Sequence, residues 1–334
     1  MKKITMLDVA QKANVSKSTV SQYINNRYEY MAESTKMRIE DAIRELGYIP
    51  NFVAKSLKQK KSSTIGVIVA NILHTFSTEI IRAIEDVCEK NEFHLFVCNA
   101  DDNPEKERAY IDMLLAKQVD GLIIFPTIGN EDQYKRLKLS NFPIVFVDRK
   151  LEKTIYPTLL LDNERAAEIA VQEIVQKGHR KIGLVSMSLS QKVTPRIERI
   201  NGYKKTLKQN DLPVKDDWII AAERKDIIPE LEKMWLKEKT PEAFFATNDL
   251  SLIELLKFLR KRNLKVPDDV SVIAVDDSDF LEISATPITA IKQPTFEIGN
   301  DAASVLLDLI RNPQFEEVYE IKRYAPALVE RESL

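Results

Sequence analysis

Glycine is scarce in this sequence of 334 residues, which contains eight of them. No G-x-G-x-x-G pattern occurs, so the fingerprint of dinucleotide-binding folds is absent. Gly178 and Gly183 have the spacing of a phosphate-binding loop, but Leu184 and Val185 follow where that loop requires lysine and then serine or threonine. A G-x-S-x-G nucleophile elbow is also missing. These absences argue against an enzyme, and no cofactor is expected.

Cysteine, histidine and long apolar runs are equally sparse. The two cysteines, Cys88 and Cys98, cannot form a disulfide framework, which favours a reducing cytoplasm. The three histidines lie far apart and lack the spacing of metal ligands, so no metal site is predicted. No stretch approaches the roughly 18 consecutive apolar residues of a membrane span. The charged N-terminus has no secretory signal, and we expect a cytoplasmic protein that binds no membrane.

Positive charge is concentrated near the N-terminus, although the whole chain has a net charge of −2. Residues 1–61 contain twelve basic and six acidic residues, which gives this segment a net charge of +6. Residues 62–334 contain 37 basic and 45 acidic residues, which gives a net charge of −8. Such a division is typical of a polyanion-binding segment joined to an acidic globular body.

The first fifty residues have the pattern of three short helices. Thr5 and Ser16 are suitable N-caps for the first two helices, because their side-chain oxygens can accept a backbone N–H. A third helix is predicted over 33–46, and Gly47 can adopt the left-handed conformation that ends it. Two short helices joined by a tight turn, with a third behind them, describe a helix-turn-helix unit. Residues 51–64 favour a short helix that is marginal alone, followed by a polar linker.

From residue 65 onward, short apolar runs alternate with amphipathic helical stretches. Strands are predicted at 65–70, 94–98, 121–125, 143–147, 158–161, 181–186, 218–222, 243–246, 270–275 and 288–291. This alternation predicts an α/β fold with parallel sheets covered by helices on both faces. The order restarts at residue 181 and ends with a helix over 296–310, which suggests two similar lobes in tandem. Ligands of open α/β sheets bind outside the carboxyl ends of the strands, so a ligand cleft is expected between the lobes.

Several different short motifs follow one another along the chain in a characteristic order. In the N-terminal segment they are Asp8-Val9-Ala10, Ala13-Asn14-Val15-Ser16, Thr19-Val20-Ser21, Asn25, and the runs over 42–51 and 54–57. In the rest of the chain they are Val147-Asp148-Arg149, the run over 178–183, Arg199 with Gly202-Tyr203, Asn248-Asp249 and the run over 266–271. This set resembles the lactose-repressor (LacI/GalR) family of bacterial transcription regulators over essentially the whole chain. Asn14 replaces the usual glycine, and asparagine is the next-best left-handed residue.

The resemblance implies an organisation in three parts. Residues 1–50 would form a helix-turn-helix DNA-binding domain, 51–64 a hinge helix with a linker, and 65–334 a two-lobed body like a periplasmic binding protein. The body would bind a small-molecule effector and dimerise. The protein would then be a homodimeric DNA-binding regulator, most often a repressor in this family, of carbohydrate or sugar-acid metabolism. The chain looks closest to the subgroup that regulates 2-keto-3-deoxygluconate use.

The second helix of a helix-turn-helix unit enters the major groove of a DNA operator. Lys17, Ser18 and Gln22 share one face of that helix and occupy the positions that read bases in the family. Glutamine can pair with adenine and lysine with guanine acceptors, whereas the alternative is an ordinary solvated face. The residues expected to contact phosphates and fix the register are Thr5, Ser16, Ser21 and Asn25.

The hinge segment contributes two further candidates for DNA binding. Leu57 resembles the family's leucine that wedges into the minor groove and kinks the duplex. The alternative is a linker leucine that packs on Phe52 or the core. Lys58 would neutralise a nearby phosphate. Because this segment is marginally helical, folding on binding is expected there.

The resemblance also places a set of side chains at the effector cleft. They are Phe76, Arg149, Arg199, Asn248, Asp249 and Asp276. Arg196 and Arg224 fall near cleft positions as well. Because arginine binds carboxylate or phosphate bidentately, the hypothesis is an anionic effector such as a sugar acid or sugar phosphate. The alternative is that each arginine is only a surface charge.

Two other functions remain open at this point. The body could be controlled by a phosphoprotein co-repressor, with the cleft secondary. The chain could also be a sugar-binding protein without DNA function, but the basic segment 1–61 and the missing secretory signal argue against it.

Overall fold

The computed structural model describes residues 4–48, 62–153, 155–237, 240–312 and 321–334. The predicted hinge residues Leu57 and Lys58 lie outside these ranges. The chain divides into two compact units, Met1–Ser62 and Ser63–Leu334, which are called the headpiece and the body below.

The headpiece consists of three helices, α1 (Met6–Lys12), α2 (Lys17–Ile24) and α3 (Glu33–Leu46). The predicted caps are confirmed. Thr5 Oγ1 accepts the Asp8 N–H at 3.4 Å, and Ser16 Oγ accepts the Thr19 N–H at 3.1 Å. Gly47 ends α3 with a φ of 59°, in the left-handed region that favours glycine.

The headpiece core is small. Its buried side chains are Val9, Ala10, Ala13, Val20, Ile39, Ala42 and Tyr48. They come from α1, α2, α3 and the residues just after α1 and α3, so each helix contributes one apolar side to the same cluster. Asn14 has a φ of 51° and makes the turn between α1 and α2, as the sequence predicts.

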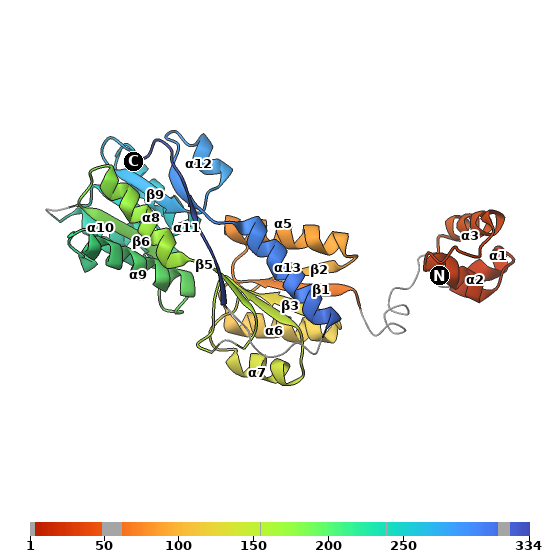
Figure 1. The fold of residues 1–334 in the computed structure, drawn as a ribbon. Coiled ribbons are helices and arrows are strands. Elements are labelled where there is room, and N and C mark those ends of the chain that lie inside the picture. The colour runs from red at the N-terminus through yellow and green to blue at the C-terminus, as the bar shows by residue number, and fades with distance from the viewer. Residues whose placement is uncertain (1–3, 49–61, 154, 238–239, 313–320) are drawn as a thin grey trace. The chain divides into compact units, whose positions relative to one another are not determined.

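The body contains two sheets of six strands, each in its own lobe (Figure 1). The N-terminal lobe has the strand order β11-β5-β4-β3-β1-β2, and its strands pair in parallel. Their bounds are Thr64–Val69 (β1), His94–Asn99 (β2), Gly121–Ile124 (β3), Ile144–Val147 (β4), Thr158–Leu161 (β5) and Ile321–Tyr324 (β11). The helices of this lobe are α5 (Thr75–Lys90), α6 (Pro104–Ala116), α7 (Glu131–Leu139) and α13 (Thr295–Arg311).

Alternating side chains of β1 pack against helices on both faces of this sheet. Val67 and Val69 pack under α5 and α13, whereas Ile68 packs with α6 on the opposite face. The helices α5 and α13 lie side by side, and Gly299 lets them approach closely (Figure 1). A Cβ at this position would lie 2.6 Å from the Cβ of Ala83, so a larger residue would force the two helices apart.

The C-terminal lobe has the strand order β12-β10-β9-β8-β6-β7, in which β12 alone is antiparallel to its neighbour. The strands are Ile182–Met187 (β6), Ile219–Ala222 (β7), Ala243–Ala246 (β8), Ser271–Val275 (β9), Thr289–Lys292 (β10) and Ala327–Val329 (β12). The helices are α8 (Asn163–Gln176), α9 (Thr194–Gln209), α10 (Arg224–Trp235), α11 (Asp249–Lys261) and α12 (Asp279–Ile283). One core lies under α8 and α9, and the other lies under α10 and α11.

Every strand predicted in the body is present, with bounds within one residue, and the α/β fold class is confirmed. The simple tandem arrangement is wrong, because the chain passes between the lobes three times. It crosses after β5, again between β10 and α13, and finally between β11 and β12. The physical reason is that the apolar side of α13 packs on α5, and β11 pairs with β5. Within the described ranges, no helix is long and apolar enough to cross a membrane.

Candidate DNA interface and effector cleft

Helix α2 separates a buried side from an exposed one. Val20 is fully buried in the headpiece core. Lys17, Ser18 and Gln22 are exposed, and Lys17 has no ion-pair partner among the residues that the structure describes. The three predicted base-reading side chains are therefore exposed and do not contribute to the headpiece core.

The side chains predicted to contact phosphates also have partners within the headpiece. The hydroxyls of Thr5 and Ser16 cap α1 and α2. The side-chain amide of Asn25 donates to the carbonyl of Ser21 at 2.6 Å and holds the end of α2. These residues fix the two helices that form the turn, so a phosphate contact there would come in addition to a structural role.

The cleft of the body contains two adjoining pockets at the carboxyl ends of strands. The outer pocket has a volume of about 280 Å³ and includes Asp102 after β2, Thr127 after β3 and Arg149 after β4. The inner pocket has a volume of about 50 Å³ and includes Asn248 after β8 and Asp276 after β9. Both pockets contain Arg149, which joins them. The cleft lies where parallel sheets are expected to bind ligands.

Most of the side chains predicted to bind the effector meet at the inner pocket. These are Phe76, Arg149, Arg196, Arg199, Asn248 and Asp276. Phe76 and Arg149 belong to the N-terminal lobe, whereas the others come from the C-terminal lobe. The structure thus brings together residues that are up to two hundred positions apart.

Arg224 is separate from this group. It lies at the start of α10, outside both pockets, with its side chain 39% exposed. Its Nε donates to Glu254 Oε1 at 2.9 Å, so its charge is neutralised on the C-terminal lobe. The expectation that Arg224 faces the cleft is corrected by this placement.

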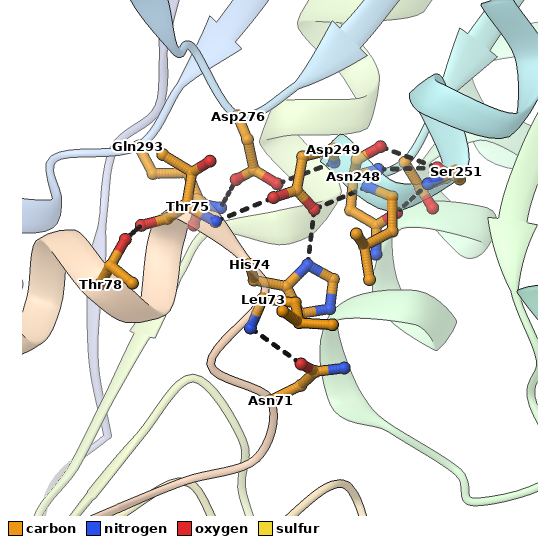
Figure 2. A network of polar contacts seen from close by, with 12 residues as sticks. Asn71, Leu73, His74, Thr75, Thr78, Asn248, Asp249, Ser251, Asp276 and Gln293 are labelled. Carbon is orange, nitrogen blue, oxygen red and sulfur yellow. Dashed lines mark hydrogen bonds and ion pairs between the residues drawn. The ribbon is translucent and has the colours of Figure 1, made fainter. Parts of the chain in front are cut away.

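Asp249 lies beside the inner pocket and links the two lobes (Figure 2). His74 Nδ1 lies 2.5 Å from Asp249 Oδ1, and the Thr75 N–H donates to Asp249 Oδ2 at 2.8 Å. His74 is the residue before α5, and no side chain of its own segment caps that helix. A carboxylate from the opposite lobe therefore caps α5, where the helix dipole favours negative charge.

This contact changes the protonation of both partners. Burial would lower the pKa of His74, but the hydrogen bond and the charge of Asp249 outweigh it and raise the pKa. Burial would raise the pKa of Asp249, but His74 and two backbone N–H donors lower it. Both shifts favour a charged pair across the cleft.

Arg199 is buried at the floor of the inner pocket. Its Nε donates to Asn163 Oδ1 at 2.9 Å, and its Nη1 donates to the carbonyl of Thr247 at 2.5 Å. Asp276 accepts from Gln293 Nε2 at 2.5 Å (Figure 2). Burial, together with the nearby Asp249, raises the pKa of Asp276. The floor of the pocket is therefore a fixed guanidinium beside a carboxyl group whose charged form is disfavoured.

Three buried polar atoms at the inner pocket have no hydrogen-bond partner among the residues that the structure describes. They are Arg149 Nε, Thr247 Oγ1 and Gln293 Oε1. Buried polar groups are nearly always paired, and each unpaired one suggests an absent water, ion or ligand. One donor, one hydroxyl and one acceptor in the same small pocket match the hydroxyl-rich surface of a polar metabolite.

Metal binding and thiol chemistry find little support in the part of the chain that the structure describes. No group of three or more histidine, cysteine, aspartate or glutamate side chains there could hold a metal ion. Cys88 and Cys98 are buried free thiols, as expected for core residues. Burial raises the pKa of Cys88 to about 11, so this thiol is unreactive at neutral pH.

Comparison with known proteins agrees with this geometry. Residues 5–51 match the model of the bacterial regulatory proteins, lacI family, and residues 171–334 match a periplasmic binding protein-like domain. The chain is 44% identical over 334 residues to the probable HTH-type transcriptional regulator EndR of Paenibacillus polymyxa, covering 99% of this chain and 98% of that protein. The chain belongs to the lacI family of bacterial regulatory proteins.

Other lacI-family proteins are similar over most of their length. The chain is 32% identical over 305 residues to catabolite control protein A of Priestia megaterium, covering 91% of each protein. A crystal structure of the lac repressor dimer bound to operator and the anti-inducer ONPF covers 99% of each chain, with 26% identity and a TM-score of 0.84. This lacI-family chain is a DNA-binding transcriptional repressor, and the prediction that it is not an enzyme is confirmed by its relatives.

Two cleft residues of this lacI-family repressor escaped the sequence analysis. His74 contacts a partner 175 positions away, and Asp102 contacts Arg196 at a separation of 94 positions. A local pattern cannot reveal such pairs. The available signals were weak: His74 lies shortly before a helical pattern, and Asp102 lies four positions after the predicted strand over 94–98.

Proposed function

We propose that this repressor binds a pseudo-palindromic operator as a homodimer, and that a small polar effector held in the cleft of each body controls its affinity for DNA. The observation that carries the effector half is the set of buried atoms without a hydrogen bond in the described part of the chain, which are Arg149 Nε, Thr247 Oγ1 and Gln293 Oε1. A ligand with several hydroxyl or carboxyl groups would give each atom a partner, and its binding would link the two lobes.

The exposed face of α2 supports the operator half of the proposal. Lys17 and Gln22 are long enough to reach base edges, with guanine acceptors for lysine and adenine for glutamine. A homodimer presents two such faces, which is why the operator is expected to repeat in two half-sites. The related lac repressor structure is itself a dimer on its operator.

The charges of the cleft favour an anionic effector. Arg149, Arg196 and Arg199 line the inner pocket, and burial raises the pKa values of Asp148 and Asp276. Raised pKa values make these two carboxyl groups weaker partners for the arginines, which favours a ligand that brings its own negative charge. We therefore propose a sugar acid or a sugar phosphate, with 2-keto-3-deoxygluconate as the first candidate.

A pair of buried threonines gives a sharp test of the effector site. Thr247→Val removes a hydroxyl that has no partner in the ligand-free protein, so the melting temperature should stay unchanged. The same change should remove one contact to the effector, worth about 1 kcal/mol or a roughly fivefold loss of affinity. Calorimetry would measure binding of 2-keto-3-deoxygluconate, gluconate, glucose 6-phosphate and glucose.

The matched control is Thr206→Val, in α9 and outside both pockets. Thr206 Oγ1 donates to the carbonyl of Gly202 at 2.8 Å, so this variant should lose about 1 kcal/mol of stability and keep effector affinity. Preferential binding of glucose would contradict the anionic class. If ligands bind but none changes operator affinity in a gel-shift titration, control through the cleft is refuted.

A further inference from the structure

Asp102 projects into the outer pocket from an unusual turn. Asp101 and Asp102 follow β2 with φ values of 53° and 55°, so two consecutive non-glycine residues adopt the left-handed conformation. The Asp102 N–H donates to the carbonyl of Ala70 at 2.8 Å, which anchors the turn beside β1. Backbone conformations of this kind cost free energy and persist where the surrounding structure enforces them.

The Asp102 carboxylate sits between two guanidinium groups. Arg149 Nη2 donates to Asp102 Oδ1 at 2.6 Å, and Arg196 Nη2 donates to Asp102 Oδ2 at 3.1 Å. The side chains of Arg149, Arg196 and Asp102 are only 8%, 10% and 16% exposed. Asp102 and Arg149 belong to the N-terminal lobe and Arg196 to the C-terminal lobe, so this carboxylate also joins the lobes.

Among the described residues, Asp102 is the only carboxylate in this cluster that accepts hydrogen bonds from both guanidinium groups. Burial would raise the pKa of Asp102, but the charges of Arg149 and Arg196 lower it, so Asp102 is ionised and supplies one negative charge. The carboxyl group of Asp148 lies 3.4 Å from Arg149 Nε, yet burial raises the pKa of Asp148 and disfavours its charge. Arg149 Nε itself is buried without a hydrogen-bond partner. The cluster therefore has a guanidinium N–H that no hydrogen bond uses, and it faces a cavity of about 280 Å³.

We propose that Asp102 stands in for the anionic group of the effector, and that the carboxylate or phosphate of the effector replaces Asp102 between Arg149 and Arg196. This inference rests on the proposed function of the cleft as an effector site. A ligand carboxylate can accept from the same two guanidinium groups that Asp102 uses, and a phosphate has a third oxygen for Arg149 Nε. The charged link between the lobes then passes through the ligand instead of through Asp102.

The test is anion rescue of Asp102→Asn, with inorganic phosphate as the probe. The variant keeps the shape of the side chain but leaves two buried guanidinium groups without a counter-charge, so its melting temperature should fall below that of the wild type. Phosphate should recover most of this loss, when compared with chloride at equal ionic strength. In the double variant Asp102→Asn/Arg196→Gln this recovery should disappear, because the anion needs both guanidinium groups.

The matched control is Glu198→Gln, which also removes a partly buried carboxylate between the lobes. Glu198 accepts from Arg323 at 2.7 and 2.9 Å, is 12% exposed in its side chain, and lies outside both pockets. This variant should melt earlier than the wild type and gain no more from phosphate than the wild type does. The control matters because phosphate stabilises most proteins through exclusion from their surfaces.

Equal phosphate responses of Asp102→Asn, Glu198→Gln and the wild type would overturn the proposal. An Asp102→Asn protein that stays unfolded even in phosphate would also overturn it, because an anion must be able to take the place of the side chain. Phosphate binding does not depend on the natural effector. Rescue without any sugar-acid binding would therefore count against the proposed effector class alone.

Discussion

The headpiece and the body place their functional side chains in opposite environments. In the headpiece, Lys17, Ser18 and Gln22 are exposed on α2, and a small core behind them holds the fold. In the body, Arg196 and Arg199 are buried and bonded within the protein. Lys17 and Gln22 can therefore be changed with little effect on the stability of the headpiece, whereas a change of Arg196 or Arg199 also removes contacts that stabilise the body.

The largest expected effect is unfolding of the headpiece while the body stays folded. Val20→Asp would bury an unpaired charge in the small headpiece core, which should cost about 3–5 kcal/mol or more and unfold this unit. Because the body has its own cores, its calorimetric transition and its effector binding should remain. Operator binding should be abolished. A shift of both transitions together would show that the two units are not independent.

A smaller effect is expected from the exposed face of α2. Gln22→Ala should weaken binding to an operator selected from random DNA by about 1–3 kcal/mol, because a bidentate base contact is lost. The melting temperature should not change, since Gln22 is exposed. Gln11→Ala, an exposed glutamine on α1, is the matched control and should leave operator affinity intact. Equal affinities of the two variants would remove Gln22 from the interface.

The smallest expected effect is a change with pH in the stability of the body, which the headpiece should not share. The pKa of His74 is raised in the folded body, so protonated His74 stabilises the body fully at pH values below its unfolded pKa of about 6.5. This contribution is lost as the pH rises through the raised folded pKa. All three histidines belong to the body, so the headpiece transition should be constant across the same range. Chemical denaturation of the wild type and of His74→Gln over a series of pH values from 6 upward measures the difference in unfolding free energy, which should decrease as the pH rises.

Local sequence signals predict the headpiece almost completely. Thr5, Ser16 and Gly47 act through backbone groups within a few positions, so their caps could be predicted without knowledge of the fold. The exposed face of α2, which holds the predicted base-reading residues, followed from the positions of Val20 and Ile24 on the opposite side of the helix.

The body was predictable in its strands but not in its connections. The apolar runs located the other strands, whereas β11 contains two charged residues and β12 is only three residues long. The placement of α13 on the N-terminal lobe depends on the close approach that Gly299 allows, which no periodicity reveals. The resemblance put both Arg196 and Arg224 near the cleft, but the structure separates them: Arg196 contacts Asp102 in the cleft, whereas Arg224 pairs with Glu254 outside both pockets.

The three crossings between the lobes have a consequence for synthesis on the ribosome. The three helices of the headpiece end at Leu46, so this unit can fold as soon as it emerges from the ribosome. The N-terminal lobe needs α13 and β11, which are translated near the end of the chain, at Thr295–Arg311 and Ile321–Tyr324. A nascent chain therefore carries a folded DNA-reading unit long before it has a finished body to control it.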